Sequence, residues 1–538
     1  MLAAMAVVLF SWCLLIIAFC GLGYAIFAIF RFELEDDRFF YAFWTGFCLV
    51  LFFLQLWHLA LPVNEKALLL ILLTGVCGFA LTFRECAADL RKFLNVYHLL
   101  LVAGLAVFLS NRALAPIKLS DAGLYHLTAI QWNSFYPIIP GLGNLIDRMG
   151  ANDSYFLYHA FLEPVPFVRS FHLANGLLLF VLLLQMAVSL FRAAGREARI
   201  TDWFLLILMP AAFGQMLDHA EDTSPDLPIF IYFVLIGAKL CASLFGAQTQ
   251  KQKAFDVFYI SCLAATAVSM RVSAVAFGFA AALIVLWRYK SGVVWLSPAL
   301  CVFVVWIFGN IILTGYPFYP SSLFPFPVDW KVPETSVEGL AKWISSWARQ
   351  PGGDPAVVLS SWAWLSDWSK SLFVERQNCF EIVFPTCLFI AGMIVSKGTV
   401  RTVLWIIAPA IVSILFWFYE APAPRFAGAS FWYLAAGIWA PSLRKARIEL
   451  KYLCFVLVSA FLAVSRVYYA PAYVRTKPIQ EYSTAKTHFA TDSGLLLFVP
   501  KEGNSCWESP LPCTGYPNPK LKLRSGDDLS RGFAVDRQ

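Results

Sequence analysis

Charged side chains are scarce in this 538-residue chain, where Asp, Glu, Lys and Arg make up 14% of the residues against 59% hydrophobic ones. Soluble domains typically carry about 25% charged residues, which they need to cover their surface. Long uncharged runs occur instead, for example 1–30 and 173–190. A helix of about 20 apolar residues crosses the core of a bilayer. The sequence therefore predicts an all-α polytopic membrane protein.

Other absences exclude further classes of protein. The apolar runs do not alternate with polar residues, as the strands of a transmembrane β-barrel do. The first run, 1–21, lacks a basic segment before it and continues past the length of a signal peptide, so we predict a first transmembrane helix. The net charge of +7 is not clustered on one face, so we expect no nucleic-acid partner. No internal repeat supports the inverted architecture of many transporters.

Hydropathy predicts about fourteen hydrophobic spans. They lie near residues 4–30, 39–61, 67–83, 94–111, 172–191, 202–217, 228–246, 255–269, 272–288, 293–313, 382–396, 402–419, 428–442 and 451–468.

Basic residues in the short loops predict the orientation of these spans. Alternate loops carry Arg or Lys, such as Arg31, Arg38, Arg192 and Arg199, and such loops face the cytoplasm. We therefore expect a transmembrane domain over 1–470 and an outer tail over 471–538. The longer hydrophilic loops would share that outer side, where the protein would do its work; they are 112–171, 217–227, 314–381 and 419–427.

Two of the thirteen cysteines differ from the rest. Most lie in the spans, where cysteine acts as a small apolar residue. Cys506 and Cys513 lie in the polar segment CWESPLPC on the predicted outer side, where oxidising conditions allow a disulfide. A zinc site would need a second ligand pair, which is missing. We predict a disulfide and no cofactor; a divalent metal stays an open alternative that no residue pattern indicates.

The first long outer loop contains the segment SDAGLYHLTAIQW, residues 120–132. Its apolar residues recur at a spacing that predicts a short helix in the membrane interface, with one face on lipid. Asp121 and Tyr125 are four positions apart and would share a face of that helix, next to His126. Asp121 could cap the helix or act in catalysis, and the two roles are compatible.

A second cluster of acids occupies the short outer loop DHAEDTSPDLP, residues 218–228. Five titratable groups, Glu221 and Asp222 among them, fall within eleven residues. Capping of the next helix needs only one acid. The cluster is therefore either a binding site or a solvated loop.

Two arginines and a tyrosine complete the candidate set. Arg271 lies between two short apolar runs, where a cation at membrane depth marks a functional site or a paired charge. Arg425, in EAPAPRFAG, follows two prolines in a stiff loop and is a candidate anion ligand. Snorkelling to the interface is the alternative for both. Tyr316 lies in TGYPFYPSS, a rigid turn that leads into the largest loop.

Acids and arginines on one outer face suit the transfer of a sugar from a lipid phosphate. The leaving phosphate needs cations rather than an acid, and the attacking hydroxyl needs one base. A hydrolase that cuts a glycosidic bond would need two cooperating carboxyl groups.

Several of these segments together resemble the GT-C superfamily of integral-membrane glycosyltransferases, which use polyprenyl-phosphate sugars as donors. The likeness rests on DAGLYH in the first large outer loop, on acids in a later loop and on basic residues that would meet the lipid phosphate. YHLTAIQWNSFYPIIPGLGNL, NIILTGYPFYPS, PAPRFAGASFW and CWESPLPCTGYPNPKLKLR are similar to a poorly characterised bacterial branch with many spans. The chain differs in having four predicted spans before Asp121 and alanine at position 122.

The resemblance implies an inverting transfer to a periplasmic protein, lipid or glycan, in a bacterial inner membrane. Asp121 would be the general base, and Arg271 and Arg425 would hold the donor phosphate. Tyr125, His126, Glu221, Asp222 and Tyr316 would bind sugar or acceptor. The open alternatives are an O-antigen ligase or polymerase, a flippase of lipid-linked oligosaccharide, and a non-catalytic envelope scaffold.

Overall fold

The computed structural model of the chain describes residues 2–34, 37–92, 96–195, 197–214, 216–246, 248–395, 400–443 and 482–536. The predicted span 451–468 and residues 471–481 of the predicted tail lie outside these ranges.

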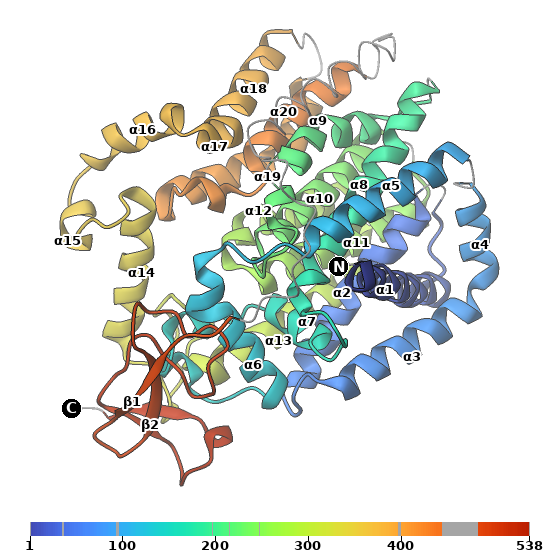
Figure 1. The fold of residues 1–538 in the computed structure, drawn as a ribbon. Coiled ribbons are helices and arrows are strands. Elements are labelled where there is room, and N and C mark those ends of the chain that lie inside the picture. The colour runs from blue at the N-terminus through green and yellow to red at the C-terminus, as the bar shows by residue number, and fades with distance from the viewer. Residues whose placement is uncertain are drawn as a thin grey trace.

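Eight helical segments in the described part of the chain are long and apolar enough to cross a membrane (Figure 1). They are built on α1 (Leu2–Phe30), α2 (Arg38–His58), α8 (Ala174–Ala194), α10 (Asp226–Phe245), α11 (Gln250–Met270), α13 (Ser297–Thr314), α18 (Phe384–Val395) and α19 (Val400–Glu420). A ninth candidate is the pair α3 (Glu65–Leu81) and α4 (Phe83–Arg91), which is bent by 75°.

The remaining predicted spans in this part of the chain form shorter apolar helices. These are α5 (Val96–Ala113), α9 (Ile200–Gly214), α12 (Val275–Arg288) and α20 (Ser430–Leu443). Helices of 14 or 15 residues, such as α12, α20 and α9, are shorter than the bilayer core requires. The described part of the chain therefore contains eight full-length spans, or nine with the bent pair. The predicted count of fourteen is not confirmed there, because a hydropathy window detects an apolar run without testing the length of its helix. The protein is a helical membrane protein with some shorter buried helices.

Short helices make up the long loops. The α-helices are α6 (Leu127–Phe135), α7 (Tyr155–Leu162), α14 (Glu334–Arg349), α15 (Pro355–Val358), α16 (Trp364–Val374) and α17 (Arg376–Asn378). Short 3₁₀ or π-helical segments are η1 (Ala122–His126), η2 (Leu142–Asn144), η3 (Asp147–Ala151), η4 (Ser170–His172), η5 (Met216–His219), η6 (Val272–Ala274), η7 (Lys290–Leu296), η8 (Cys379–Val383), η9 (Pro424–Ala427) and η10 (Leu529–Arg531).

The described tail is built from strands, which the all-α prediction did not include. β1 (Lys486–Ala490) pairs antiparallel with β2 (Leu496–Pro500), and β3 (Leu521–Leu523) pairs antiparallel with β4 (Phe533–Val535). The tail packs on the outer loops: the amide of Phe533 donates to the carbonyl of Pro140 at 2.9 Å, and Arg524 is paired with Asp329 at 2.7 Å. It therefore lies beside α6 and α14 at one corner of the molecule (Figure 1).

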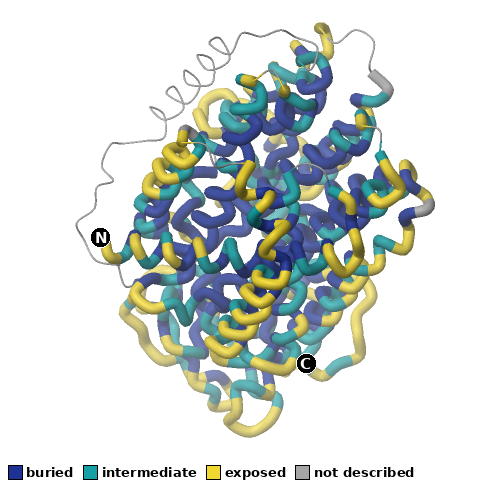
Figure 2. Tube along the Cα trace, turned by 90° about the vertical axis from the view of Figure 1, so that its right-hand side faces the viewer, coloured by how far each residue is buried: buried dark blue, intermediate teal, exposed yellow. Residues whose placement is uncertain are grey.

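The buried interior runs through the middle of the helix bundle (Figure 2). The backbones of α1 and α2 approach closely, since a Cβ on Gly46 would lie 1.9 Å from the carbonyl oxygen of Phe19. The same holds for α1 and α3, where a Cβ on Gly21 would lie 2.0 Å from the carbonyl oxygen of Gly75. Small residues at such crossings let membrane helices pack tightly. α11 begins with a capping box between Thr249 and Gln252 and ends at Arg271, whose backbone is extended. Arg271 is therefore the first residue after the end of α11.

Candidate functional site

Asp121 stands at the start of a π-helical turn, η1, which runs directly into α6. π-turns are rare and often occur at functional sites. The side chain of Asp121 makes no capping hydrogen bond, so capping is not what it does here. It instead pairs with Arg425, with 3.0 Å between Oδ2 and Nη1. The first and last predicted outer loops therefore meet at this acid.

α6 is not the lipid-facing helix that its apolar spacing predicted. Leu127, Ile130 and Trp132 are each no more than 2% exposed, and α6 packs against α7. That prediction was wrong because apolar periodicity shows that one face is covered, without showing whether lipid or protein covers it. The consequence for the site is rigidity, since the helix after Asp121 is held by protein.

Asp121 remains ionised in this setting. Burial alone would raise the pKa of Asp121, but the nearby Arg425 and Arg148 outweigh it and hold the pKa below its ordinary value. His126 behaves oppositely, because burial lowers its pKa to about 3 and keeps the ring neutral. Its Nδ1 lies 2.8 Å from the hydroxyl oxygen of Thr223, which joins the first outer loop to the second. The site thus contains a charged carboxylate beside a neutral imidazole.

Arg271 and Arg425 lie on the same aromatic ring. The guanidinium carbons are 4.8 and 5.0 Å from the centre of Phe426, respectively. Arg271 is also paired with Asp226 at the start of α10. Burial and the charge of Arg425 lower the pKa of Arg271, which reflects two cations held close together. Such a pair favours an anion between or beside the two guanidinium groups.

A third arginine, Arg148, was missed by the sequence analysis. It lies 5.9 Å from the ring centre of Tyr125 and 4.7 Å from that of Trp343 on α14. On the same helix, Trp347 lies 5.2 Å from the guanidinium of Arg425. α14 therefore lays two indole rings over the arginines of the site. The sequence feature that could have predicted this is the spacing of four residues between the two tryptophans, which puts them on one face of an amphipathic helix.

Asp153 is a second acid that the sequence analysis missed. It accepts a hydrogen bond from the amide of Tyr155 at 2.9 Å. Burial raises the pKa of Asp153 to about 7, although that hydrogen bond and Arg271 act in the opposite direction. A cavity of about 30 Å³ is lined by Asp153, Asn152 and Arg148, among others, which is polar enough to hold a water molecule.

The acids of the second loop mainly hold that loop together. Asp222 accepts a hydrogen bond from Asn175 at 2.9 Å and lies 2.7 Å from Nδ1 of His219. Glu221 is buried and lies 2.8 Å from Nη1 of Arg112. Burial raises the pKa of Glu221 to about 7, against the opposing effect of Arg112. Their contacts place the loop that carries Thr223 against His126.

Tyr316 also has a packing role. It is fully buried in a small cluster with Tyr319, Val332, Val337 and Leu340. Its hydroxyl donates to the carbonyl of Val332 at 3.1 Å. Tyr316 therefore braces the start of the third outer loop.

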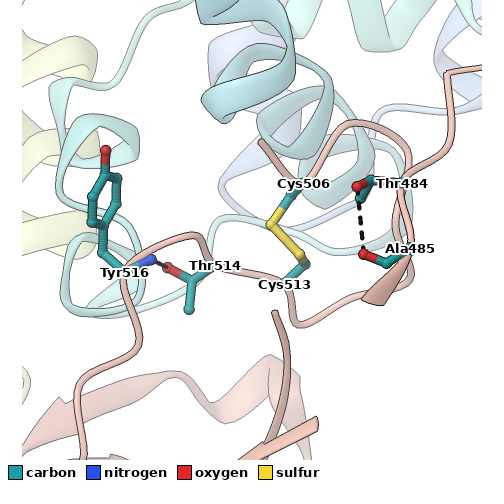
Figure 3. Close-up of a disulfide and its surroundings, with 6 residues drawn as sticks. All are labelled: Thr484, Ala485, Cys506, Cys513, Thr514 and Tyr516. Carbon is teal, nitrogen blue, oxygen red and sulfur yellow. Dashed lines mark hydrogen bonds between the residues drawn. A yellow bond between two sulfur atoms is a disulfide. The ribbon is translucent and has the colours of Figure 1, made fainter. Parts of the chain in front are cut away.

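The tail forms one wall of the turn that follows Asp121. The amide of Trp507 donates to the carbonyl of Gly123 at 3.0 Å, and a Cβ on Gly123 would lie 2.5 Å from the indole of Trp507. Only glycine leaves room for this ring. A disulfide joins Cys506 to Cys513 (Figure 3), so the indole sits at the base of a closed loop of the tail.

No group of three or more His, Cys, Asp or Glu side chains suited to a metal ion occurs in the ranges that the structure describes.

Comparison with known proteins gives a family without an assigned activity. A family profile described as "Domain of unknown function (DUF8201)" matches residues 5–432. The chain belongs to this family. No curated protein and no solved structure matches the chain. The DUF8201 match includes Asp121, Arg148, Arg271 and Arg425, and it ends before the tail that carries Trp507.

Proposed function

We propose that this DUF8201 protein is an inverting glycosyltransferase that takes a sugar from a polyprenyl-phosphate donor. The observation that carries the proposal is the pair of Asp121 and Arg425. An ionised carboxylate, 22% exposed, stands beside a guanidinium that is 33% exposed. A base for the acceptor and a cation for the leaving phosphate are thus adjacent, and substrates can reach both.

The reaction would be a single displacement at the anomeric carbon. The Asp121 carboxylate would take the proton of the acceptor hydroxyl as its oxygen forms a bond to that carbon. The bond from the anomeric carbon to the phosphate oxygen breaks, and its electron pair leaves with the phosphate. Arg425 and Arg271 would stabilise this developing charge. Attack opposite to the leaving group inverts the configuration.

The surroundings support a donor that is both anionic and apolar. Arg148 adds a third cation near Asp121, and Trp343 and Trp347 offer faces on which a sugar ring or an isoprenoid chain can lie. Beyond them, α16 exposes large apolar side chains, such as Leu365, which is 36% exposed, and Phe373, which is 70% exposed. A lipid chain could therefore approach the arginines from the side of α14 to α16.

The proposed location is a bacterial inner membrane, with the site on the periplasmic face. It is supported by the opposite end of the bundle, where Arg192 and Arg199 pair with Asp37. These arginines belong to the short basic loops that face the cytoplasm in membrane proteins. The acceptor would then be a periplasmic protein, lipid or glycan.

The test is sugar transfer by purified protein in detergent. The probes are synthetic polyprenyl phosphates that carry radiolabelled hexoses or pentoses, and membrane extract supplies the acceptor. We expect release of polyprenyl phosphate together with a labelled product of inverted configuration. Movement of intact fluorescent lipid-linked oligosaccharide across liposomes, with no cleavage of any donor, would refute the proposal and favour a flippase.

A further inference from the structure

Two cavities adjoin each other at the end of the bundle away from Asp121. Each has a volume of about 310 Å³. They share four lining residues, Phe39, His98, Val188 and Phe191. These lie near the beginnings of α2 and α5 and near the end of α8, whereas the other end of α5 leads to Asp121. Figure 1 accordingly places α4, which contributes to both cavities, far from the tail.

The first cavity is an apolar crevice between α1, α5 and α8. Its described lining is almost wholly aliphatic and aromatic, and includes Trp12, Ile16, Val102 and Leu184. Leu99 and Leu101 also line it and are 51% and 38% exposed, so it opens to the side of α5. A cavity with so few polar groups does not hold water and suits a hydrocarbon chain.

The second cavity is a polar mouth to this crevice. Its lining carries three cations and three carboxylates: Arg38, Lys92, Arg192, Asp37, Asp89 and Glu197. Lys92 pairs with Asp89 at 2.9 Å, and Arg192 with Asp37 at 2.8 Å. Within the described residues, Arg38 and Glu197 have no partner of opposite charge. Among the residues that the structure describes, one cation and one carboxylate of the mouth therefore lack a counter-charge.

Two buried nitrogen atoms at the mouth, one from a guanidinium group and one from an imidazole ring, have no hydrogen-bond partner among the described residues. They are Nε of Arg38 and Nδ1 of His98. The ring of His98 is held 4.2 Å from that of Phe191, at the junction of the two cavities. A buried donor without an acceptor costs free energy. An acceptor oxygen at this junction would therefore stabilise the Nε–H group of Arg38, and also His98 in the tautomer that carries its proton on Nδ1.

We propose that the two cavities together bind one phospholipid with a zwitterionic, phosphoethanolamine headgroup. Its phosphate accepts hydrogen bonds from Arg38 and His98, its ammonium group pairs with Glu197, and one acyl chain fills the crevice beside Val102. A purely anionic headgroup leaves Glu197 unneutralised. The apolar segment 451–468 could fill the crevice, but its charged residues are Lys451 and Arg466, so it brings no anion for Arg38.

The test uses photolabelling of the full chain in nanodiscs. The discs consist of phosphatidylglycerol with a small fraction of phosphatidylethanolamine that carries a diazirine in one acyl chain. Mass spectrometry should find the label on peptides of α1, α5 and α8, enriched over the label from photoactivatable phosphatidylglycerol at the same fraction. The readout does not depend on sugar transfer, so the lipid site and the proposed transferase activity can fail separately.

Matched variants separate a built site from general contact with the bilayer. Ala106→Trp fills the crevice and should abolish the enriched label, whereas Val107→Trp, on an exposed position of the same helix that does not line the crevice, should retain it. Arg38→Gln should reduce labelling by about tenfold, the cost of one hydrogen bond to a charged group. Arg84→Gln, on the exposed surface of α4, should leave it unchanged.

Three results would overturn the proposal. They are equal labelling by the two lipids, equal labelling of the Ala106→Trp and Val107→Trp variants when both elute as monodisperse protein, and cross-linking of a photoreactive residue at position 102 to segment 451–468 instead of lipid.

Discussion

Asp121→Asn removes one negative charge and the oxygen that can accept a proton, and it preserves the shape of the side chain. The structure limits the effect on stability. Asp121 makes no capping hydrogen bond, and its ion pair with Arg425 is partly exposed on both sides. Exposed pairs of this kind contribute about 0–1 kcal/mol, whereas general-base catalysis contributes about 10²–10⁴-fold in rate. We therefore expect kcat to fall by that factor with little change in stability.

The same substitution should not weaken binding of the donor, although it lowers kcat. Asp121 is paired with Arg425 before the donor binds, so the donor phosphate has to compete with this carboxylate for the guanidinium. The asparagine variant frees this guanidinium, so KM for the donor should stay constant or decrease. Steady-state transfer of the labelled sugar, with thermal unfolding in the same detergent, measures both quantities.

Asp222→Asn is the matched control. Asp222 accepts a hydrogen bond from Asn175 and lies close to His219, so the variant should unfold at lower temperature while its folded fraction keeps most of its kcat. The reasoning would be refuted if Asp121→Asn kept wild-type kcat, or if Asp222→Asn lost kcat while Asp121→Asn did not.

The pH dependence of transfer gives an independent check on the same residue. Because the pKa of Asp121 is held below its ordinary value of 3.8, the base is charged throughout the neutral range. The ionised carboxylate of Asp121 contributes fully to folding stability above pH 3.8. This contribution is lost only as the pH falls through the lower pKa of the folded state. Protonation of Asp121 should therefore not limit kcat at neutral or mildly acidic pH. A loss of rate near neutral pH that disappears in the Asp121→Asn variant would contradict this assignment.

Three further predictions concern the rest of the site. Arg425→Lys keeps the charge but loses the planar fork that matches a phosphate, so KM for the donor should rise about tenfold, the effect of one charge-assisted hydrogen bond; an unchanged KM would contradict phosphate binding there. Glu221 has a folded-state pKa of about 7 against an ordinary 4.5, so the folded state binds more protons and stability should decrease as the pH rises between those values. Thermal unfolding of Glu221→Gln should show no such decrease of stability with pH, whereas the control Asp218→Asn should still show it. An unchanged pH dependence in Glu221→Gln would mean that another group causes it. Trp507→Ala and Cys506→Ser should both lower kcat with donor KM unchanged, and Trp507→Phe should restore part of it; full activity of Trp507→Ala would show that the tail does not shape the site.

The convergence of the loops was predictable because topology follows from local sequence. Positive charge in short loops and apolar runs between them placed Asp121, Asp222 and Arg425 at one end of the bundle. The contacts of Asp121 with Arg425 and of His126 with Thr223 fit that arrangement. The precise partners were not predictable, since Arg425 is separated from Asp121 by 304 residues and hydropathy contains no information on which loops touch.

The features that the sequence analysis missed are all set by tertiary packing. α6 has an apolar spacing typical of an interfacial helix, yet α7 covers it. Arg148 and Asp153 look like ordinary loop residues in the sequence. Only the fold shows that Arg148 lies against α14 and that Asp153 lies near Arg271. The apolar run 272–288 predicted a full span, but its α-helix, α12, has only 14 residues. In each case the local pattern showed that a surface is covered or a charge is present, and only the fold determined its neighbour.

Gly123 shows why the site and the tail must be considered together. Glycine in a helical segment costs about 1 kcal/mol relative to alanine, which by local rules makes it a poor choice two residues after Asp121. The cost is offset where the indole of Trp507 occupies the space of a Cβ and its amide bonds to the carbonyl of Gly123. Asp121 and Gly123 lie within the DUF8201 match and Trp507 lies beyond it. The turn that carries the proposed base is therefore shaped by a part of the chain outside the family region.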